Sequence, residues 1–150
     1  MTTPHTFVGF VADFPARNEG DQPAGKELAQ FLHAHLTAVG LAISAPEDRE
    51  GWAWQMFTRN GELEVTTIVG EVDDMEASPP RQWLVTNDCA VPFLKKVFRG
   101  TEFEAKRVSL LRKLCEELHT VMSNDSRFSH ITWYDANTFD KPGDIPSEKP

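Results

Sequence analysis

Hydrophobic positions along the chain follow two different periods, which separate strands from helices. Residues 6–13 (TFVGFVAD) form a nearly continuous apolar run, which predicts an interior strand that is apolar on both faces. Between residues 24 and 39, five large apolar side chains recur at spacings of three and four, and Gly40 follows as a stop signal. This pattern predicts a helix over residues 24–39.

A second and longer helix is predicted after Gly100. Thr101 and Glu104 form a capping-box pattern, in which the threonine side chain accepts a hydrogen bond from a free amide of the first turn. The residues behind it form one apolar stripe, about five turns long, on a single side of the helix. Its members are Val108, Leu111, Leu114, Cys115, Leu118, Val121 and Met122. Residues 92–100 are predicted to form a short helical or irregular piece that ends at Gly100.

The remaining strands follow from alternation and from turn residues. Residues 52–72 contain two sheet-like runs, residues 82–86 alternate around Trp83 and Val85, and residues 128–134 place Ile131 and Trp133 on one face. Loops are predicted at residues 14–23 and 45–51, where proline, glycine and polar residues gather.

This order of elements, β-α-β-β-β-α-β, predicts an α+β fold. We expect a single domain over residues 1–136, with a mostly antiparallel sheet of about five strands packed with two main helices. Residues 137–150 contain three prolines and one glycine, and they are predicted to be a flexible C-terminal tail.

The pair Asn60-Gly61 predicts how the two runs of residues 52–72 face each other. Asn-Gly is the preferred pair for the centre of a type I′ turn, and it would place Arg59 opposite Glu62. One face of this hairpin is then apolar and is predicted to face the core: Trp52, Trp54, Met56, Leu63, Val65 and Val69. The other face collects Gln55, Phe57, Arg59, Glu62, Glu64, Thr66 and Ile68. An exposed Trp-x-Trp platform for recognition is the alternative, and the register argues against it.

Composition supports one hydrophobic core in a protein of the cytoplasm. The chain has 150 residues, of which 40% are hydrophobic and 10% aromatic, so global disorder is not expected. No apolar run approaches the roughly 20 residues needed to cross a membrane, and residues 1–6 lack the pattern of a signal peptide. The two cysteines, Cys89 and Cys115, are far apart and suit buried thiols in a reducing cytoplasm.

The formal net charge of −8 disfavours nucleic acid as a ligand, because phosphate binding needs local positive charge. The charge is also unevenly distributed. Residues 41–90 carry ten acids and three arginines, whereas residues 91–124 carry seven bases and four acids. An acidic middle segment either steers a cationic partner toward the protein or serves only to keep the protein in solution.

Motifs for catalysis, metals and phosphates are missing from the sequence. It has no GxSxG nucleophile motif and no glycine-rich phosphate loop. His33 and His35 are two residues apart on a helix, so they point in different directions and cannot share a metal ion by themselves. Asp73-Asp74 lacks the alternating oxygen ligands of a calcium loop. We therefore predict no catalytic residue, no metal and no cofactor.

These observations favour a non-enzymatic, acidic domain that binds a protein partner. A toxin-neutralising immunity protein or a phage-encoded inhibitor that occludes a cationic partner is an example of this class. The residues predicted to bind the partner lie in the hairpin and its acidic exit: Phe57, Glu62, Glu64, Ile68, Asp73, Asp74, Met75 and Glu76.

Two alternatives remain open. One is a small-molecule pocket or weak enzyme where the sheet meets the helices, near His35, Cys89 or Trp83. The other is a homo-oligomeric assembly subunit, with a dimer formed through the sheet face or an edge strand.

Overall fold

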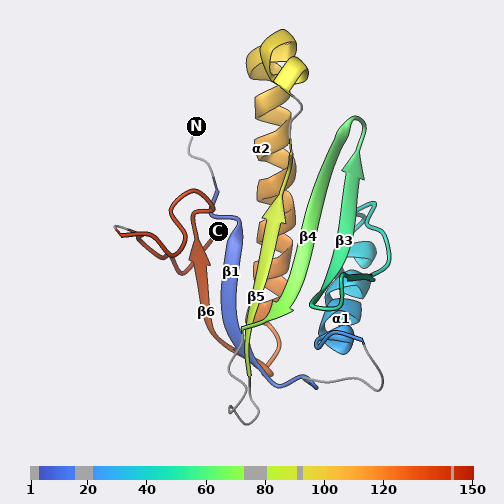
Figure 1. The fold of residues 1–150 in the computed structure, drawn as a ribbon, viewed down its shortest axis with the longest axis vertical. Coiled ribbons are helices and arrows are strands. Elements are labelled where there is room, and N and C mark those ends of the chain that lie inside the picture. The colour runs from blue at the N-terminus through green and yellow to red at the C-terminus, as the bar shows by residue number, and fades with distance from the viewer. Residues whose placement is uncertain (1–3, 16–21, 73–80, 91–92, 143) are drawn as a thin grey trace.

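Six strands form a single antiparallel sheet in the order β2-β3-β4-β5-β1-β6 (Figure 1). The structure is a computed structural model that describes residues 4–15, 22–72, 81–90, 93–142 and 144–150, with the backbone alone over residues 93–99. The strands are β1 (Phe7–Ala12), β2 (Glu47–Arg49), β3 (Ala53–Asn60), β4 (Leu63–Glu71), β5 (Arg81–Asp88) and β6 (Phe128–Tyr134). The helices are α1 (Lys26–Ala38) and α2 (Phe93–Ser123). The predicted α+β class is confirmed.

The sheet has six strands rather than the predicted five, because β2 lies in a segment that the sequence predicts to be a loop. This edge strand is three residues long and entirely polar, so it shows no hydrophobic alternation. Polar side chains attach it to β3 instead. Arg49 donates a hydrogen bond to Gln55, and the amide of Gln55 donates one to Glu47.

Both helices lie behind the sheet in the view of Figure 1, so one face is covered and the other is open. Alternate strand residues therefore have different surroundings. On β5, for example, Trp83, Val85 and Asn87 are buried, whereas Leu84 and Thr86 between them are partly exposed. We call the side without helices the open face.

Three buried tryptophans span the core between the sheet and the helices, and each places its indole N–H on an acceptor. Trp54 donates to the carbonyl of Pro23, Trp83 donates to the carbonyl of Ala12, and Trp133 donates to the His119 ring. These bonds matter because a buried N–H group without a partner costs free energy.

A short chain of buried polar groups crosses the covered face of the sheet. The hydroxyl of Thr67 on β4 donates a hydrogen bond of 2.7 Å to Asn87 on β5. The side-chain amide of Asn87 then donates one of 3.0 Å to the backbone carbonyl of Thr6. All three residues are buried, so this chain ties the pairing of three neighbouring strands to one arrangement.

The β3–β4 hairpin has a register that differs from the prediction by two residues. Asn60 pairs with Leu63, so the central residues of the turn are Gly61 and Glu62 rather than Asn60 and Gly61. Of these two, only Gly61 has a positive φ, of 61°, which matches a type II′ turn. The predicted type I′ turn is therefore wrong.

A shift of two residues leaves each side chain on its predicted face, because strand side chains alternate with a period of two. Trp54, Met56, Leu63, Val65 and Val69 are all buried, as expected. The shift changes the cross-strand partners: Arg59 now lies opposite Glu64, and Phe57 lies opposite Thr66 instead of a carboxylate. These pairs are more favourable than an aromatic ring against a charge.

Helix α1 ends as predicted at Gly40, through two backbone hydrogen bonds. The amide of Gly40 donates to the carbonyl of Thr37, and the amide of Leu41 donates to the carbonyl of Leu36. Gly40 adopts a φ of 93°, a left-handed conformation in which glycine pays no steric cost. Leu36 and Leu41 are both buried, which adds the apolar contact typical of this helix end.

Helix α2 is interrupted at Gly100, whose φ of 58° and ψ of −142° are not helical. The interruption falls where the sequence predicts a short piece to end and the long helix to begin. The apolar stripe of the long helix is buried as predicted. Neither described helix is both long and apolar enough to span a membrane.

The C-terminal tail runs back along the outer edge of β6. The amide and carbonyl of Ser147 pair with those of Trp133 at 2.8 and 2.7 Å. Phe139 packs edge-on against Tyr134 and Phe7, with ring centroids 5.1 and 5.6 Å apart. The segment predicted to be flexible therefore makes specific contacts with β6 and with the open face.

The left-handed conformation of Gly40 at the end of α1 can be tested by substitution. Gly40→Ala is expected to destabilise the protein by about 1 kcal/mol, because alanine pays a steric cost at this φ. Gly70→Ala in β4 is the matched control, since an added Cβ there would meet only the Cβ of Ala53 at 3.8 Å. Urea unfolding measures the free energy of unfolding of both variants. Equal values would contradict a left-handed conformation that requires glycine at position 40.

Candidate functional site

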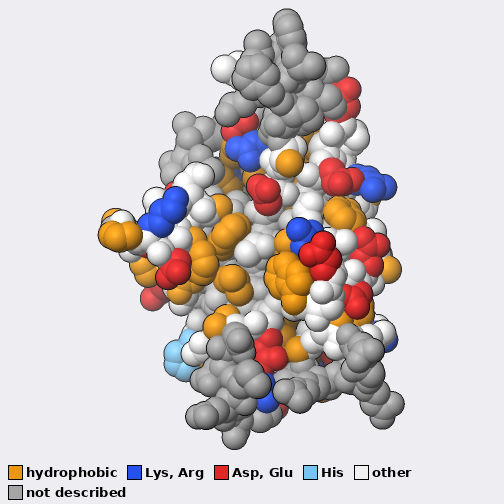
Figure 2. Space-filling view, in the orientation of Figure 1, with side chains coloured by type: hydrophobic (Ala, Val, Ile, Leu, Met, Phe, Trp, Pro, Cys, Tyr) orange, Lys and Arg blue, Asp and Glu red, His pale blue; other side chains and the backbone are white. Residues whose placement is uncertain are grey.

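The open face is a surface on which partly exposed apolar side chains of the described strands have no helix over them. Figure 2 shows hydrophobic side chains spread over the middle of this face, with charged groups among them and toward the borders. The partly exposed apolar residues come from five strands and the chain that follows β6: Phe7, Val11, Phe57, Ile68, Leu84, Tyr134 and Phe139. Exposed apolar area of this kind is typical of a surface that contacts another molecule.

The structure brings three of the predicted partner-binding residues together on this face. Phe57 and Ile68 are partly exposed on neighbouring strands, since Phe57 pairs with Thr66 and Ile68 pairs with Gln55. Glu64 lies on the same face and forms a 2.6 Å ion pair with Arg59. Because this pair is exposed to water, it contributes at most about 1 kcal/mol to stability, and its net charge is close to zero.

Glu62 lies apart from these three residues. It is exposed in the hairpin turn and lines a groove of about 490 Å³ between the turn and helix α2. Lys106 and Phe103 of α2 line the other side of this groove. The remaining predicted residues, Asp73, Asp74, Met75 and Glu76, lie outside the described residues.

Trp52 is an exposed aromatic residue, and the prediction that it faces the core is wrong. The prediction places it in the core, but 56% of its surface is exposed because β3 begins one residue later, at Ala53. The chain turns just before it, with Glu50 and Gly51 at φ values of 51° and 81°, and the amide of Trp52 donates to the carbonyl of Arg49. This turn removes Trp52 from the strand alternation.

The position of Arg49 places Trp52 beside the open face. The Arg49 guanidinium hydrogen-bonds to Gln55, which belongs to the open face, and lies 5.9 Å from the centre of the Trp52 ring. The tryptophan is therefore an additional apolar group at the β2–β3 border of this surface. A glycine directly before a tryptophan was the sequence signal that the ring follows a turn.

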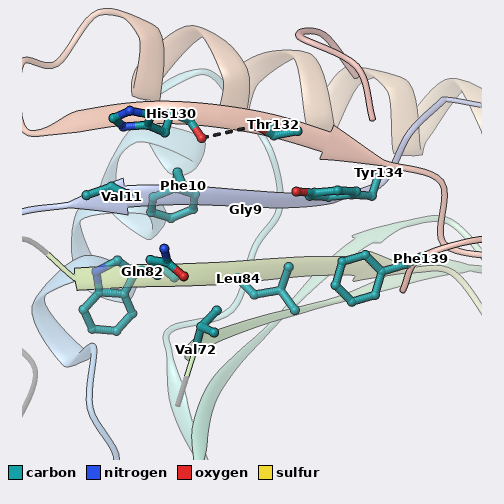
Figure 3. Close-up of a pocket in the computed structure, with 11 residues that line it drawn as sticks. Gly9, Phe10, Val11, Val72, Gln82, Leu84, His130, Thr132, Tyr134 and Phe139 are labelled. Carbon is teal, nitrogen blue, oxygen red and sulfur yellow. Dashed lines mark hydrogen bonds between the residues drawn. The ribbon is translucent and has the colours of Figure 1, made fainter. Parts of the chain in front are cut away.

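A hollow of about 210 Å³ lies on the open face where β1, β5 and β6 meet the tail. Gly9 on β1 faces Leu84 on β5 and Thr132 on β6, so the middle of the hollow has no side chain on β1. Figure 3 shows Tyr134 and Phe139 at one end of the hollow and His130 at the other, with Leu84, Val72 and Gln82 along it.

A bulge in β6 places His130 at the end of this hollow. Val11 pairs with Ser129 and Gly9 pairs with Thr132, so β6 has one residue more than β1 between these pairs. His130 takes up the extra residue with a φ of 54°, which is uncommon for a side chain other than glycine. The Thr132 hydroxyl donates to the His130 carbonyl at 3.3 Å. Bulges of this type re-aim a side chain, and here the imidazole is exposed beside the hollow.

On the opposite side of the sheet, His119 has two polar neighbours but is not arranged as a catalytic base. The indole N–H of Trp133 donates to His119 Nδ1 at 3.0 Å, so this nitrogen carries a lone pair. The proton of the neutral ring is then on Nε2, which lies 3.3 Å from the Ser123 hydroxyl. In this tautomer Nε2 donates to Ser123 and cannot accept its proton, as nucleophilic catalysis would require.

The two cysteines are free thiols, and both are buried. Burial raises the pKa of Cys89, although the positive charge of Arg107 acts in the opposite direction. Burial also raises the pKa of Cys115, which lies in the core as predicted. Both side chains are therefore protonated thiols at neutral pH and poor nucleophiles.

The other residues considered for a pocket or metal site do not converge. His35 lies between the helices, with Nε2 3.6 Å from Glu117, and Trp83 is buried under the sheet. Within the described ranges, no group of three or more histidine, cysteine, aspartate or glutamate side chains is placed to hold a metal ion.

Comparison of the chain with protein-family models, with curated proteins and with solved structures finds no match in any of the three.

The burial of His119 predicts a dependence of stability on pH. Burial, with a smaller effect of the Lys149 charge, lowers the pKa of His119 below its ordinary value of 6.5. The folded state therefore disfavours the protonated ring, so the contribution of His119 to stability is complete above pH 6.5 and is lost as the pH falls through its lowered pKa. Besides Lys149, the carboxylate of Glu116 lies in the same small depression as His119.

His119→Gln is the test variant, because glutamine offers an acceptor to Trp133 without titrating. Urea unfolding between about pH 8 and pH 5 is expected to show that the wild type loses more stability than this variant as the pH falls. Parallel pH curves for the two proteins would contradict the prediction.

Proposed function

We propose that this protein is a non-enzymatic binding domain that docks its open sheet face against a protein partner with a cationic surface. The observation that carries the proposal is that both helices cover the same side of the sheet and leave Phe57, Ile68 and Leu84 partly exposed on the other. Trp52 adds a large exposed ring at the border of this face. Partly exposed aromatic and aliphatic residues at the centre of a surface are typical anchors of an interface.

Charge supports the choice of a cationic partner. The described part of strands β2 to β5 and their connections, residues 47–72 and 81–88, carries seven acids and three arginines. Residues 101–123 of helix α2, behind the sheet, carry four acids and four bases. The excess negative charge therefore lies on the sheet and its connections rather than on this helix. A field of this kind raises the rate of encounter with a positively charged surface.

The mechanism follows from these two features. Long-range attraction brings the partner to the sheet, and the apolar residues then exclude water and hold it there. Docking of the open face occludes the basic surface of the partner, as a toxin-neutralising immunity protein or a phage-encoded inhibitor would require. The proposal assigns the protein to a reducing cytoplasm, because its two cysteines are free thiols.

The first test compares truncation of apolar side chains at two places. In affinity capture from the native cell, Phe57→Ala combined with Ile68→Ala is expected to weaken binding of the captured protein by about tenfold or more. The matched control is Val39→Ala combined with Ile145→Ala, which truncates two exposed apolar residues that belong to no strand. The proposal fails if the open-face variant retains the same proteins as the control variant.

The second test measures electrostatic steering with the partner so identified. Reversal of the five acids Glu62, Glu64, Asp73, Asp74 and Glu76 to lysine is expected to slow association strongly and to remove its dependence on salt. Reversal of Glu27 and Glu102, two exposed acids on the helices, is the control and is expected to change the rate less. An unchanged association rate in the five-acid variant would rule out steering by this segment.

A further inference from the structure

We infer that the hollow beside Gly9 receives one aromatic side chain, presented by a basic segment of the partner protein. This inference rests on the proposed function and names the group that the open face recognises. It starts from the size of the hollow, which is about 210 Å³ and open to solvent. Pockets that enclose small-molecule ligands are larger, at about 300–1,000 Å³. The hollow is therefore closer in size to a single large side chain than to a metabolite.

The walls of the hollow favour an aromatic ring. Tyr134 and Phe139 stand at one end, and they already pack edge-on against each other at 5.1 Å with planes at 72°. Phe139 belongs to the tail and not to a strand. The open face therefore already binds one aromatic ring from a segment outside the sheet. A second ring in the hollow would extend the same edge-to-face packing, which is favourable in addition to the effect of burial.

The absence of charged groups among the described lining residues disfavours a charged side chain in the hollow. None of the described residues that line the hollow carries a carboxylate, an ammonium or a guanidinium group. A buried lysine or arginine would lose its hydration there without gaining a counter-ion. The amide of Gln82 and the ring of His130, both exposed at the border, offer hydrogen bonds to an indole N–H or a phenol O–H.

The surroundings of the hollow, in contrast, favour positive charge next to the ring. Gln82 and Leu84 lie on β5 and Val72 directly follows β4, and these two strands carry three acids, Glu64, Glu71 and Asp88, against one base, Arg81. Basic residues on both sides of the aromatic anchor would therefore complement the surface while the ring itself enters a neutral site.

Three tripeptides separate these contributions: N-acetyl-Lys-Trp-Lys-amide, N-acetyl-Lys-Ala-Lys-amide and N-acetyl-Glu-Trp-Glu-amide. Each is titrated into the ¹⁵N-labelled full chain, and binding is followed by amide chemical shifts. The first peptide is expected to bind with a Kd on the order of 1 mM and to shift the amides of Gly9, Leu84 and Thr132. The alanine peptide is expected to leave these amides unshifted, and the glutamate peptide to bind about tenfold more weakly.

Two substitutions at Gly9 fill the hollow without straining the backbone. A Cβ at Gly9 would make ordinary contacts, 3.5 Å from Tyr134 Cε2 and 3.9 Å from the Trp83 carbonyl oxygen. Gly9→Ala is therefore expected to fold normally and to weaken the Lys-Trp-Lys peptide about threefold, whereas Gly9→Val is expected to weaken it tenfold or more. The control is Thr66→Val on the same face, which does not line the hollow and is expected to bind as the wild type does.

Either of two results would overturn the inference: equal binding of the tryptophan and alanine peptides, or equal binding of the first peptide to wild type and Gly9→Ala in folded protein. The capture experiment separates this failure from failure of the proposed function. If the partner is lost by the Phe57 and Ile68 variant but retained by Gly9→Val, the open face binds and the hollow does not. If both variants retain the partner, the proposed function fails as well.

Discussion

Side chains on successive residues of a strand point to opposite faces of a sheet, and in this protein the helices cover only one of those faces. This constraint decides the surroundings of almost every strand residue. Trp83 and Val85 are buried against the helices, while Leu84 between them faces the open side. The core, the candidate binding face and the hollow at Gly9 all follow from the same alternation.

A sheet with this alternation is also sensitive to its register, and buried polar groups make the native register specific. Thr67, Asn87 and the Thr6 carbonyl satisfy one another through two hydrogen bonds inside the core. A slip of two residues between β4 and β5 would keep the apolar pattern but would separate these partners. Each buried polar group without a partner costs about 1–3 kcal/mol, so the slipped arrangement is disfavoured although its apolar residues remain buried.

The same reasoning explains which parts of the fold can be predicted from the sequence. The faces of β3 and β4 can be predicted because parity survives a shift of two residues. The turn is harder to predict, since Asn-Gly suits the centre of a type I′ turn while Gly-Glu suits that of a type II′ turn. Strand β2 is missed because a polar edge strand has one neighbour and buries little. Trp52 is missed because the turn before it ends the alternation that places Trp54 in the core.

The candidate site was only partly predictable for a related reason. Phe57 and Ile68 lie in the strongest local pattern of the chain, so their exposure on one face follows from neighbouring residues. The hollow depends on contacts between distant segments: Gly9 lies near the N-terminus, Leu84 in the middle, and Phe139 in the tail. No local sequence pattern predicts which strands become neighbours, because the order β5-β1-β6 arises only when the whole sheet forms.

The backbone pairing of Ser147 with Trp133 has a consequence for the fate of the protein at high concentration. Exposed sheet edges offer free N–H and C=O groups to other chains and so template intermolecular β-structure, including amyloid. The tail occupies part of this edge, at Trp133 of β6, and the opposite edge ends in β2, which is three residues long and carries Glu47, Asp48 and Arg49. Both edges of the sheet are therefore poor sites for polymerisation. Association with other chains is directed to the uncovered face instead.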